Sequence, residues 1–393
     1  MLSSQDIKIV QSTLPLIEQA GTAVTDHFYH RMFTHNPELK DIFNLSHQQS
    51  GNQKVALFEA IIAYAKNLNN LSVLKHAVER IANKHTSFHI KPENYNIVGH
   101  HLIETMRELL TSHFTQAVEE AWTAAYEVLA NLFIHREETL YSQRESMTGG
   151  WRGKRAFSLL AKTKESSLVT SFIFEPVDQQ PVMHYQPGQY IGIELKPCTS
   201  DYNEIRQYSL STVSNGSTYR ISVKRELGEH KGIVSNYLHD HLEPGDIVDL
   251  HAPAGDFYLK DRQKPVVLIS AGVGVTPMQA MLDSLVDSQY KLPVTYLHAC
   301  ENNTLHSFAE HTAQCCQKQG WQYFTWYNQE SSHDAHTFKG FINFDQIDLP
   351  IVAGDFYICG PVGFMKYAKD SLLTLGVEQD RIHYEVFGPH ATL

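Results

Sequence analysis

Apolar side chains recur every three or four positions along residues 1–147, which is the period of an α-helix. The stretch opens on Ser3 and Asp6, a pair that resembles a capping box at a helix start. The sets that show the period are Ile7, Val10, Leu14 and Ile17; Val24, Phe28 and Met32; Leu57, Ile61, Ala65 and Leu68; Leu74, Val78 and Ile81; Val98, Leu102, Met106 and Leu109; and Val118, Trp122, Ala125, Leu129 and Leu132. Because no strand pattern interrupts them, residues 1–147 are predicted to form an all-α domain.

The pattern breaks at a polar, glycine-rich stretch, and residues 148–154 are predicted to form a linker. Short alternating runs follow, such as "LVTSFIFEPV" (168–177) and "TYRISVKRE" (218–226), separated by Pro, Gly and Asn. Alternation over so few residues is typical of half-buried strands. Residues 155–262 are therefore predicted to form an antiparallel β domain, either a barrel or a sandwich, and the family resemblance described below implies the barrel.

A third pattern fills residues 263–393. "KPVVLISAGVGVTPMQAMLDSLV" (264–286) is a continuous apolar strand, a glycine turn and a helix. "LPVTYLHAC" (292–300) and "DFYICGPVGFMKYAKDSLL" (355–373) repeat the strand-to-helix theme. Alternating strands and helices indicate a parallel α/β domain. The predicted fold class is thus multidomain: all-α, then antiparallel β, then parallel α/β.

Composition excludes several classes of protein. The 393 residues carry 42% apolar and 19% charged side chains, an ordinary globular balance. A formal charge of −11 without a basic cluster argues against nucleic acid or an anionic membrane as partner. Neither a signal peptide nor a membrane helix is expected, because the start "MLSSQDIKIV" has no basic n-region and no apolar run approaches the ~20 residues that a membrane helix needs. Five cysteines without a CxxC pair fit a reducing cytoplasm.

Two histidines in "RIANKHTSFH" (80–89) raise the question of a metal. His85 continues the spacing of Leu74, Val78 and Ile81, whereas His89 follows a predicted helix end. Periodicity alone favours a satisfied core histidine. It leaves open a single axial haem ligand, and also a two-histidine metal site, for which no third ligand lies nearby.

Neighbouring motifs favour the interpretation of His85 as a haem ligand. "DHFYHRMF" (26–33) and "DIFNL" (41–45) supply aromatic residues, and Gln53 and Leu57 lie one helical turn apart. With "NYNIVGH" and "FIHREET" further on, this region resembles the globin domain of bacterial flavohaemoglobins. The resemblance implies that His85 is the proximal iron ligand, with Tyr95 and Glu137 behind it. It also implies that Phe43 packs on the porphyrin and that Tyr29, Gln53 and Leu57 form the distal pocket. A carboxylate behind the histidine would hold its tautomer and make it more basic.

The reductase motifs of the same family follow. "EIRQYSLS" (204–211) matches its R-x-Y-S flavin signature, with "PGQYIGI" (187–193) and "KGIVSNYLH" (231–239) on either side. The resemblance implies that Arg206 pairs with the FAD pyrophosphate, Tyr208 lies along the isoalloxazine and Ser209 reaches its N5 region. Further FAD contacts implied are Gln207, Tyr190, Gly232, Val234 and Ser235.

"SAGVGVTPM" (270–278) opens a helix after a strand, as a pyrophosphate-binding turn does, although it lacks the third glycine of the dinucleotide fingerprint. A tight turn alone would also explain it. "YICGPVGFM" (357–365) and the tail "YEVFGPH" (384–390) match the family's second nicotinamide loop and its terminus. The residues implied at these sites are Gly272, Val273, Gly274, Val275, Thr276, Pro277, Cys359, Gly360, Pro361, Glu385, Val386, Phe387, Gly388 and Pro389. Cys359 is expected near the nicotinamide ring, Phe387 over the flavin, and Glu385 between flavin and haem.

The resemblance implies a nitric oxide dioxygenase that contains haem b and FAD and oxidises NO with O2 to nitrate, with electrons from NADH or NADPH. Separately from the resemblance, we expect a monomer. Glu301, beyond the second parallel strand, slightly favours NADH, because an acidic residue there suits a free ribose 2′-hydroxyl. Two alternatives stay open. One is a haem-based gas sensor or oxygen-binding protein with its own reductase, and the other is a flavin reductase whose helical domain only mediates interactions.

Overall fold

The computed structural model describes residues 2–43, 52–198, 200–228, 231–329 and 336–388. The chain divides into two compact units, which are described separately. The first unit comprises residues 1–147 with the short segments 151–154 and 194–205, and the second comprises the remainder. Within the described residues, no helix is both long and apolar enough to cross a membrane.

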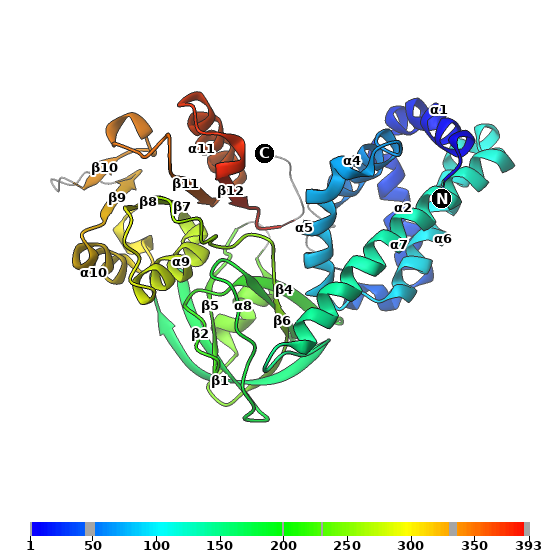
Figure 1. Ribbon diagram of the computed structural model, residues 1–393. Coiled ribbons are helices and arrows are strands. Elements are labelled where there is room, and N and C mark those ends of the chain that lie inside the picture. Colours follow the sequence, from blue (N-terminus) through cyan, green and yellow to red (C-terminus); the bar gives the residue numbers. More distant parts are fainter. Residues whose placement is uncertain (1, 44–51, 199, 229–230, 330–335, 389–393) are drawn as a thin grey trace. The chain divides into compact units, whose positions relative to one another are not determined.

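The first unit is helical, as predicted (Figure 1). Its α-helices are α1 (Ser4–Ala20), α2 (Ala23–His35), α4 (Asn52–Lys66), α5 (Lys75–Thr86), α6 (Pro92–Leu110) and α7 (Gln116–Ser146). The predicted capping box is confirmed, since the Ser3 hydroxyl accepts from the Asp6 amide and Asp6 accepts from the Ser3 amide. Val10, Ile17 and Trp122 contribute to a buried core built by α1, α2, α4, α6 and α7.

Two predicted core positions are wrong. Leu109 is 37% exposed and Leu132 is 38% exposed, whereas Leu110 and Phe133 are buried. The expected set that ends at Leu132 advances by an average of 3.5 residues, which is shorter than the 3.6-residue turn, whereas the set that ends at Leu109 advances by about 3.7 residues. Along a helix as long as α7, this mismatch rotates the expected stripe away from the face that packs.

A six-stranded antiparallel sheet follows, as predicted, and most of its residues belong to the second unit. Its elements are β1 (Lys154–Lys164), β2 (Val169–Pro176), β3 (Tyr190–Leu195), β4 (Glu204–Ser209), β5 (Tyr219–Lys224), α8 (Ile233–Asp240) and β6 (Ile247–Ala254). The strand order is β4-β3-β6-β1-β2-β5, and β2 pairs antiparallel with both β1 and β5. A bridge from Leu210 to Ile221 connects the end of β4 to β5. The two edges of the sheet therefore meet, which makes it a barrel.

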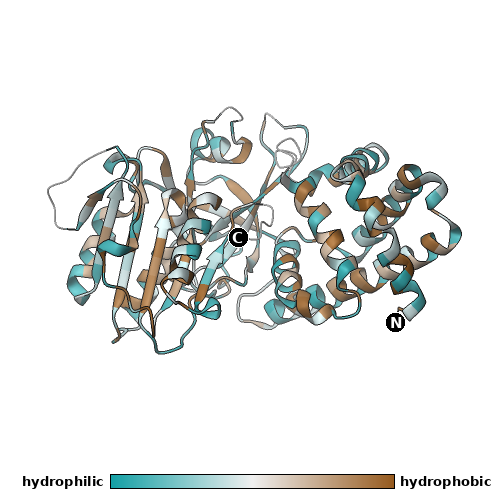
Figure 2. Ribbon diagram, turned by 90° about the horizontal axis from the view of Figure 1, so that it is seen from above, coloured by the Kyte–Doolittle hydropathy of each residue, from teal (hydrophilic) through white to brown (hydrophobic). Residues whose placement is uncertain are grey.

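The last part is a parallel sheet with the order β10-β9-β8-β7-β11-β12. Its elements are β7 (Val266–Ala271), α9 (Val275–Asp287), β8 (Val294–Cys300), α10 (Ala309–Gln319), β9 (Gln322–Tyr327), β10 (Thr337–Lys339), β11 (Asp355–Cys359), α11 (Val362–Thr374) and β12 (Ile382–Glu385). Apolar strands run between helices on both faces (Figure 2). The strand order reverses between β7 and β11, and open α/β sheets bind ligands beyond the carboxyl ends of strands at such a switch point.

Candidate functional site

His85 forms the centre of a buried hydrogen-bonded cluster in the helical unit. It lies in the last turn of α5, and its Nδ1 is 2.7 Å from Oε1 of Glu137 and 2.8 Å from the hydroxyl of Tyr95. Tyr95 lies in the first turn of α6, which begins at Pro92, and Glu137 projects from α7. The Tyr95 hydroxyl also donates to Oε1 of Glu137, whose residue is only 3% exposed. Three helices thus bring together the residues predicted behind the iron ligand.

The protonation of this cluster follows from its partners. Burial, together with the charge of Glu137, raises the pKa of Tyr95 far above its ordinary value, so the phenol stays protonated and donates. A carboxylate oxygen can only accept, which assigns the proton on His85 to Nδ1. The other ring nitrogen, Nε2, then carries the lone pair, and it forms no hydrogen bond with any described residue. The His85 side chain is 32% exposed, so Nε2 is accessible. An accessible ring nitrogen with a free lone pair is what an iron ligand needs.

The face of α5 that carries His85 differs from the expected apolar stripe. Val78 and Ile81 are only partly buried, whereas Ala82, Asn83 and Thr86 on another face are fully buried. The expectation that His85 extends a buried stripe was therefore wrong in part. A half-buried apolar face next to a basic imidazole nitrogen fits a flat apolar prosthetic group such as haem better than it fits a satisfied core histidine.

His89 does not share that face. Helix α5 ends at Thr86, and His89 has a backbone φ of 54° and a ring centroid 6.1 Å from that of Tyr141. Since His85 Nδ1 is also committed to Glu137, the geometry favours a single ligand over a two-histidine site.

The predicted distal residues lie on two helices, Tyr29 on α2 and Gln53 with Leu57 on α4. Tyr29 is 5% exposed, and its ring centroid lies 5.9 Å from Phe33 and 6.1 Å from Phe43. Leu57, on α4, packs on the same core. Gln53, one turn earlier on α4, has a buried Oε1 that has no hydrogen-bond partner among the described residues. A buried amide oxygen without a partner is costly, and it suits a pocket that receives a polar ligand.

The predicted flavin residues lie on β4 and at the start of α8. Ser209 is buried, and Arg206, Gln207 and Tyr208 are half-buried along the same strand. Burial raises the pKa of the Tyr208 phenol, so its hydroxyl stays neutral. Tyr190 begins β3 and is 5% exposed. A row of guanidinium, amide, phenol and hydroxyl groups along a barrel strand can bind both a phosphate and a planar ring.

Helix α8 offers an anion site at its amino end. Gly232 is its N-cap and supplies no side-chain cap, so the first amide groups keep their donor capacity. A Cβ at Gly232 would lie 2.4 Å from Oγ of Ser235, which is folded back over the turn. Val234 is buried beneath it. A Cβ at Gly232 would require the Ser235 hydroxyl to move, and the uncapped helix start suits the FAD diphosphate.

The predicted nicotinamide loops meet at the switch point of the parallel sheet. Residues Gly272–Gly274 follow β7, and Gly360 and Pro361 follow β11, which pairs with β7. A Cβ on Gly274 would lie 2.2 Å from the carbonyl oxygen of Cys359, so the two loops pack backbone to backbone. Helix α9 then starts at Val275, with Thr276 and Pro277 in its first turn and no side-chain cap. A pyrophosphate fits at this helix start.

The C-terminal residues lie beside the second loop. Glu385 ends β12 and pairs in register with Cys359 of β11, whose thiol is fully buried and donates to the Glu385 carbonyl at 3.6 Å. Burial raises the pKa of this thiol well above its ordinary value, so it is a neutral group. Val386 is buried and Phe387 is 44% exposed. Gly388 has a φ of 123°, and Pro389 lies outside the described residues.

Two unpredicted residues of α7, Phe133 and Arg144, support the helix that carries His85. The Phe133 ring centroid lies 5.7 Å from that of His85, and the buried Arg144 donates to Thr86 and Asn83 of α5. Both lie on the face of α7 that carries Glu137, four residues before it and seven after it. That helical spacing was the available signal.

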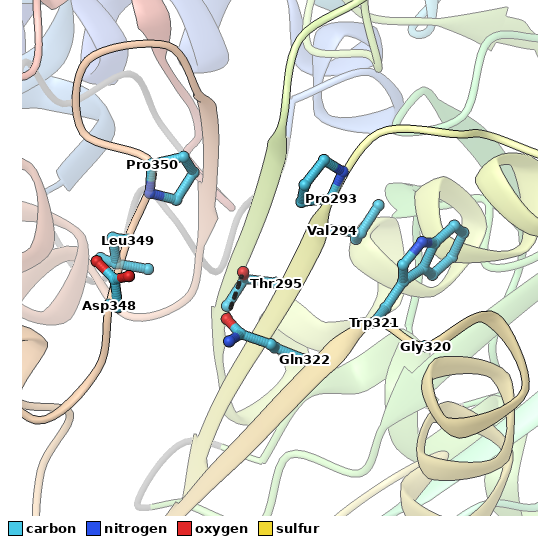
Figure 3. A pocket seen from close by; sticks show the side chains of 9 residues that line it. All are labelled: Pro293, Val294, Thr295, Gly320, Trp321, Gln322, Asp348, Leu349 and Pro350. Carbon is cyan, nitrogen blue, oxygen red and sulfur yellow. Dashed lines mark hydrogen bonds between the residues drawn. The ribbon is translucent and has the colours of Figure 1, made fainter.

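A cavity of about 510 Å³ lies elsewhere, at the amino ends of strands of the parallel sheet (Figure 3). It is lined by Pro293, Val294, Thr295, Gly320, Trp321, Gln322, Asp348, Leu349 and Pro350. These residues start β8 and β9 or precede β11, whereas the nucleotide loops follow the carboxyl ends of strands. None of the predicted site residues lines this cavity.

Comparison with known proteins agrees with the three-part organisation. Residues 26–132 match the globin family, residues 156–258 the oxidoreductase FAD-binding domain, and residues 268–370 the oxidoreductase NAD-binding domain. The fold and the sites therefore define a haem protein of the globin type joined to a flavin- and nicotinamide-dependent reductase.

Full-length relatives place this combination in one family. The chain is 58% identical to a flavohaemoprotein of Vibrio cholerae over 395 residues, covering all of both proteins. It also superposes on the crystal structure of a flavohaemoglobin from Malassezia yamatoensis with bound FAD and haem, with a TM-score of 0.89, 28% identity and coverage of 98% of this chain and 100% of that one. The FAD/NAD-binding domain of nitric oxide dioxygenase from Vibrio cholerae matches 61% of this chain and 100% of its own, at 54% identity and a TM-score of 0.58. The chain belongs to the flavohaemoprotein family.

Proposed function

We propose that this protein is a nitric oxide dioxygenase that oxidises NO with O2 to nitrate, using electrons from NADH or NADPH. The observation that carries the proposal is the His85–Glu137–Tyr95 cluster, which leaves one basic imidazole nitrogen for iron in a chain that also holds two nucleotide-type sites. Bound FAD would take up hydride and release single electrons, and haem iron would supply the site at which O2 meets NO.

His85 would hold the haem iron through its Nε2. Glu137 accepts a hydrogen bond from Nδ1 of His85 at 2.7 Å, which fixes the orientation of the ring. The negative charge of Glu137 would also make Nε2 a stronger ligand to ferric iron. Tyr95 donates to the same carboxylate oxygen and thereby holds it in place. On the opposite side, Tyr29 would donate a hydrogen bond to the O2 substrate, and Gln53 and Leu57 would line the same space, with Phe43 against the porphyrin.

Within the reductase, Arg206 and the amide groups at Gly232, Val234 and Ser235 would hold the FAD diphosphate. Tyr190, Gln207, Tyr208 and Ser209 would hold the flavin ring system and its N5 region. For the nicotinamide nucleotide, the turn from Gly272 through Pro277 would bind the pyrophosphate. Cys359, Gly360 and Pro361 would face the nicotinamide through the backbone, since the Cys359 side chain is buried, and the tail from Glu385 to Pro389 would cover the flavin.

We further propose that NADH is the preferred electron donor. Glu301 directly follows β8, the strand beside β7, and is exposed there. Its Oε2 accepts hydrogen bonds from the side chains of Asn328 at 3.1 Å and Gln329 at 3.2 Å. These bonds hold the Glu301 side chain near the C-terminal end of β8. An acidic residue in this position accepts from a ribose 2′-hydroxyl and repels a 2′-phosphate. Steady-state rates with each donor, for the native protein and Glu301→Gln, test this assignment.

The domain boundaries and setting belong to the same proposal. We place the haem domain at residues 1–147, the linker at 148–154, the FAD domain at 155–262 and the nucleotide domain at 263–393. The five free thiols suit a reducing compartment such as the cytoplasm. We expect a monomer that acts on O2 and NO, which light scattering of the purified protein checks.

The decisive experiment measures NO consumption in air-saturated buffer with an NO electrode. A dioxygenase uses one NADH for every two NO, because each NADH carries two electrons and each NO converted to nitrate requires one. His85→Ala should lose haem and NO consumption while retaining NADH-dependent ferricyanide reduction. His89→Ala, a matched change beyond the end of the same helix, should retain both activities. Sustained NO turnover by His85→Ala would refute the proposal, and negligible turnover by the native protein would favour a gas sensor.

A further inference from the structure

Three metal-ligating side chains meet where helices α9 and α10 of the nucleotide domain lie beside Arg220 of strand β5. Asp283 lies on α9, and His311 and Cys315 lie four residues apart on α10, so both face the same way. One ligand atom from each lies within 4.8 Å of the other two. Within the part of the chain that the structure describes, no other group of three such residues gathers in this way.

The separations resemble those of a tetrahedral zinc site. With Zn–N of ~2.0 Å and Zn–S of ~2.3 Å, tetrahedral angles separate nitrogen and sulfur by roughly 3.5 Å, and nitrogen and oxygen by roughly 3.3 Å. His311 Nε2 lies 3.6 Å from Sγ of Cys315 and 2.8 Å from Oδ1 of Asp283. The first distance already suits a shared ion, and the second needs only a small rotation of the exposed histidine.

Buried groups behind the cluster orient its carboxylate. Gln279 Nε2 donates to Oδ1 of Asp283 at 2.8 Å, and the Thr312 hydroxyl donates to Oε1 of Gln279 at 3.0 Å. Gln279 is 0% exposed and Thr312 is 1% exposed. Such a chain of hydrogen bonds from a ligand into the core is the usual support of a metal site. The Asp283 side chain is 14% exposed and that of His311 is 55% exposed, which leaves a path to solvent.

The surrounding charges are mixed. Nη2 of Arg220 lies 3.9 Å from the other carboxylate oxygen, Oδ2 of Asp283, while Glu165 acts on His311 and Lys318 acts on Cys315. Pairing with Asp283 raises the pKa of His311, and burial raises the pKa of Cys315. Because Zn²⁺ binds a thiolate and a neutral imidazole, its affinity for these groups would increase with pH whatever their free pKa values.

We propose that Asp283, His311 and Cys315 form a site for Zn²⁺, with water in the fourth position. The set of one nitrogen, one sulfur and one oxygen ligand selects a thiophilic divalent ion over Mg²⁺ or Ca²⁺. The ion would join α10 to α9, the helix whose amino end carries the nicotinamide loop. The competing explanation is an ion pair between His311 and Asp283 that binds no metal.

Alkylation of the thiols in the full-length holoprotein distinguishes these explanations. Zn²⁺ can also bind elsewhere on a chain with 23 histidines, so the readout has to be specific to one residue. After chelator treatment and desalting, peptide mapping by mass spectrometry follows iodoacetamide labelling of Cys315, with the exposed Cys198 as an internal control. Since alkylation requires the thiolate and metal binding occupies it, one equivalent of Zn²⁺ should slow labelling of Cys315 about tenfold or more. Labelling of Cys198 should not change, and Mg²⁺ should protect neither thiol.

Two variants complete the test. His311→Gln and Asp283→Asn should each abolish the protection of Cys315 by Zn²⁺ while the haem and flavin absorption spectra stay native. An unchanged rate of Cys315 labelling with Zn²⁺, or protection that persists in both variants, would overturn the proposal and leave an ion pair only. Neither outcome depends on nitric oxide turnover.

Discussion

Replacing Glu137 with glutamine tests how the proximal histidine is held. The change keeps the size of the side chain and its Oε1 acceptor, but it removes the negative charge that faces Nδ1 of His85 at 2.7 Å. Because Glu137 is only 3% exposed, water cannot replace the lost interaction. An imidazole with a neutral acceptor is a weaker base, so its iron should favour the ferrous state more than in the native protein.

The magnitude follows from the hydrogen bond. A bond to a charged group contributes roughly 1.5–3 kcal/mol and a neutral one roughly 0.5–1.5 kcal/mol, so the charge accounts for about 1–1.5 kcal/mol. For a one-electron couple, in which a tenfold change in equilibrium constant equals about 59 mV, the haem potential should rise by roughly 45–65 mV. The Tyr95 donor to the same oxygen remains in the variant and limits any rotation of the amide.

Spectroelectrochemical titration of the haem absorption bands in the full-length protein measures this shift. Glu127→Gln is the matched control, since it removes the same charge from an exposed position ten residues earlier on α7. It should leave the potential unchanged, because an exposed charge on another turn is screened by solvent. A Glu137→Gln potential equal to that of the native protein, or a drop in potential, would remove the carboxylate from the role assigned to it.

Other predictions concern the reductase unit. Arg206→Ala should weaken FAD binding about 10- to 100-fold, as expected for the loss of a charge-assisted contact, and gel filtration should then separate flavin from a protein with native haem absorption. Gly274→Ala places a Cβ 2.2 Å from the Cys359 carbonyl oxygen and should raise KM for NADH about tenfold or more, while Gly363→Ala, which meets no atom within 4 Å, should leave it unchanged. Burial lowers the pKa of His306 to about 4, so its contribution to stability is complete above its unfolded pKa of about 6.5 and is lost as pH falls from there toward 4, by at most about 3.4 kcal/mol. His306→Asn should therefore reduce the fall in melting temperature between about pH 7 and pH 5, and an equal fall in both proteins would contradict the assignment.

Local sequence rules predicted the elements and most of the site motifs well. The strand "VVLISA" at 266–271, the glycine turn after it and the helix from Val275 depend on residues within a few positions of one another. The capping box at Ser3 depends on a spacing of three. Because backbone preferences and turn chemistry act over such short distances, a single sequence contains enough information to predict them. The family resemblance then suggested a role for each motif.

These local rules could not predict which residues surround His85. Periodicity left a core histidine, a haem ligand and a metal pair open, and even the expected buried stripe was only half-buried. The partner that settles the ring tautomer, Glu137, lies 52 residues away on another helix. Arg144 and Phe133 joined the cluster for the same reason, since the packing of α5 on α7 determines which face of each helix is shared.

By itself the sequence determined the order of the helical, barrel and parallel α/β regions, the positions of their motifs and the ligand types available. Only the tertiary structure decided which of these residues meet, as for Asp283 and His311, which are 28 residues apart on separate helices. The physical reason is that helix and strand formation respond to neighbours along the chain. Contact between distant side chains depends instead on how whole elements bury their apolar faces against one another.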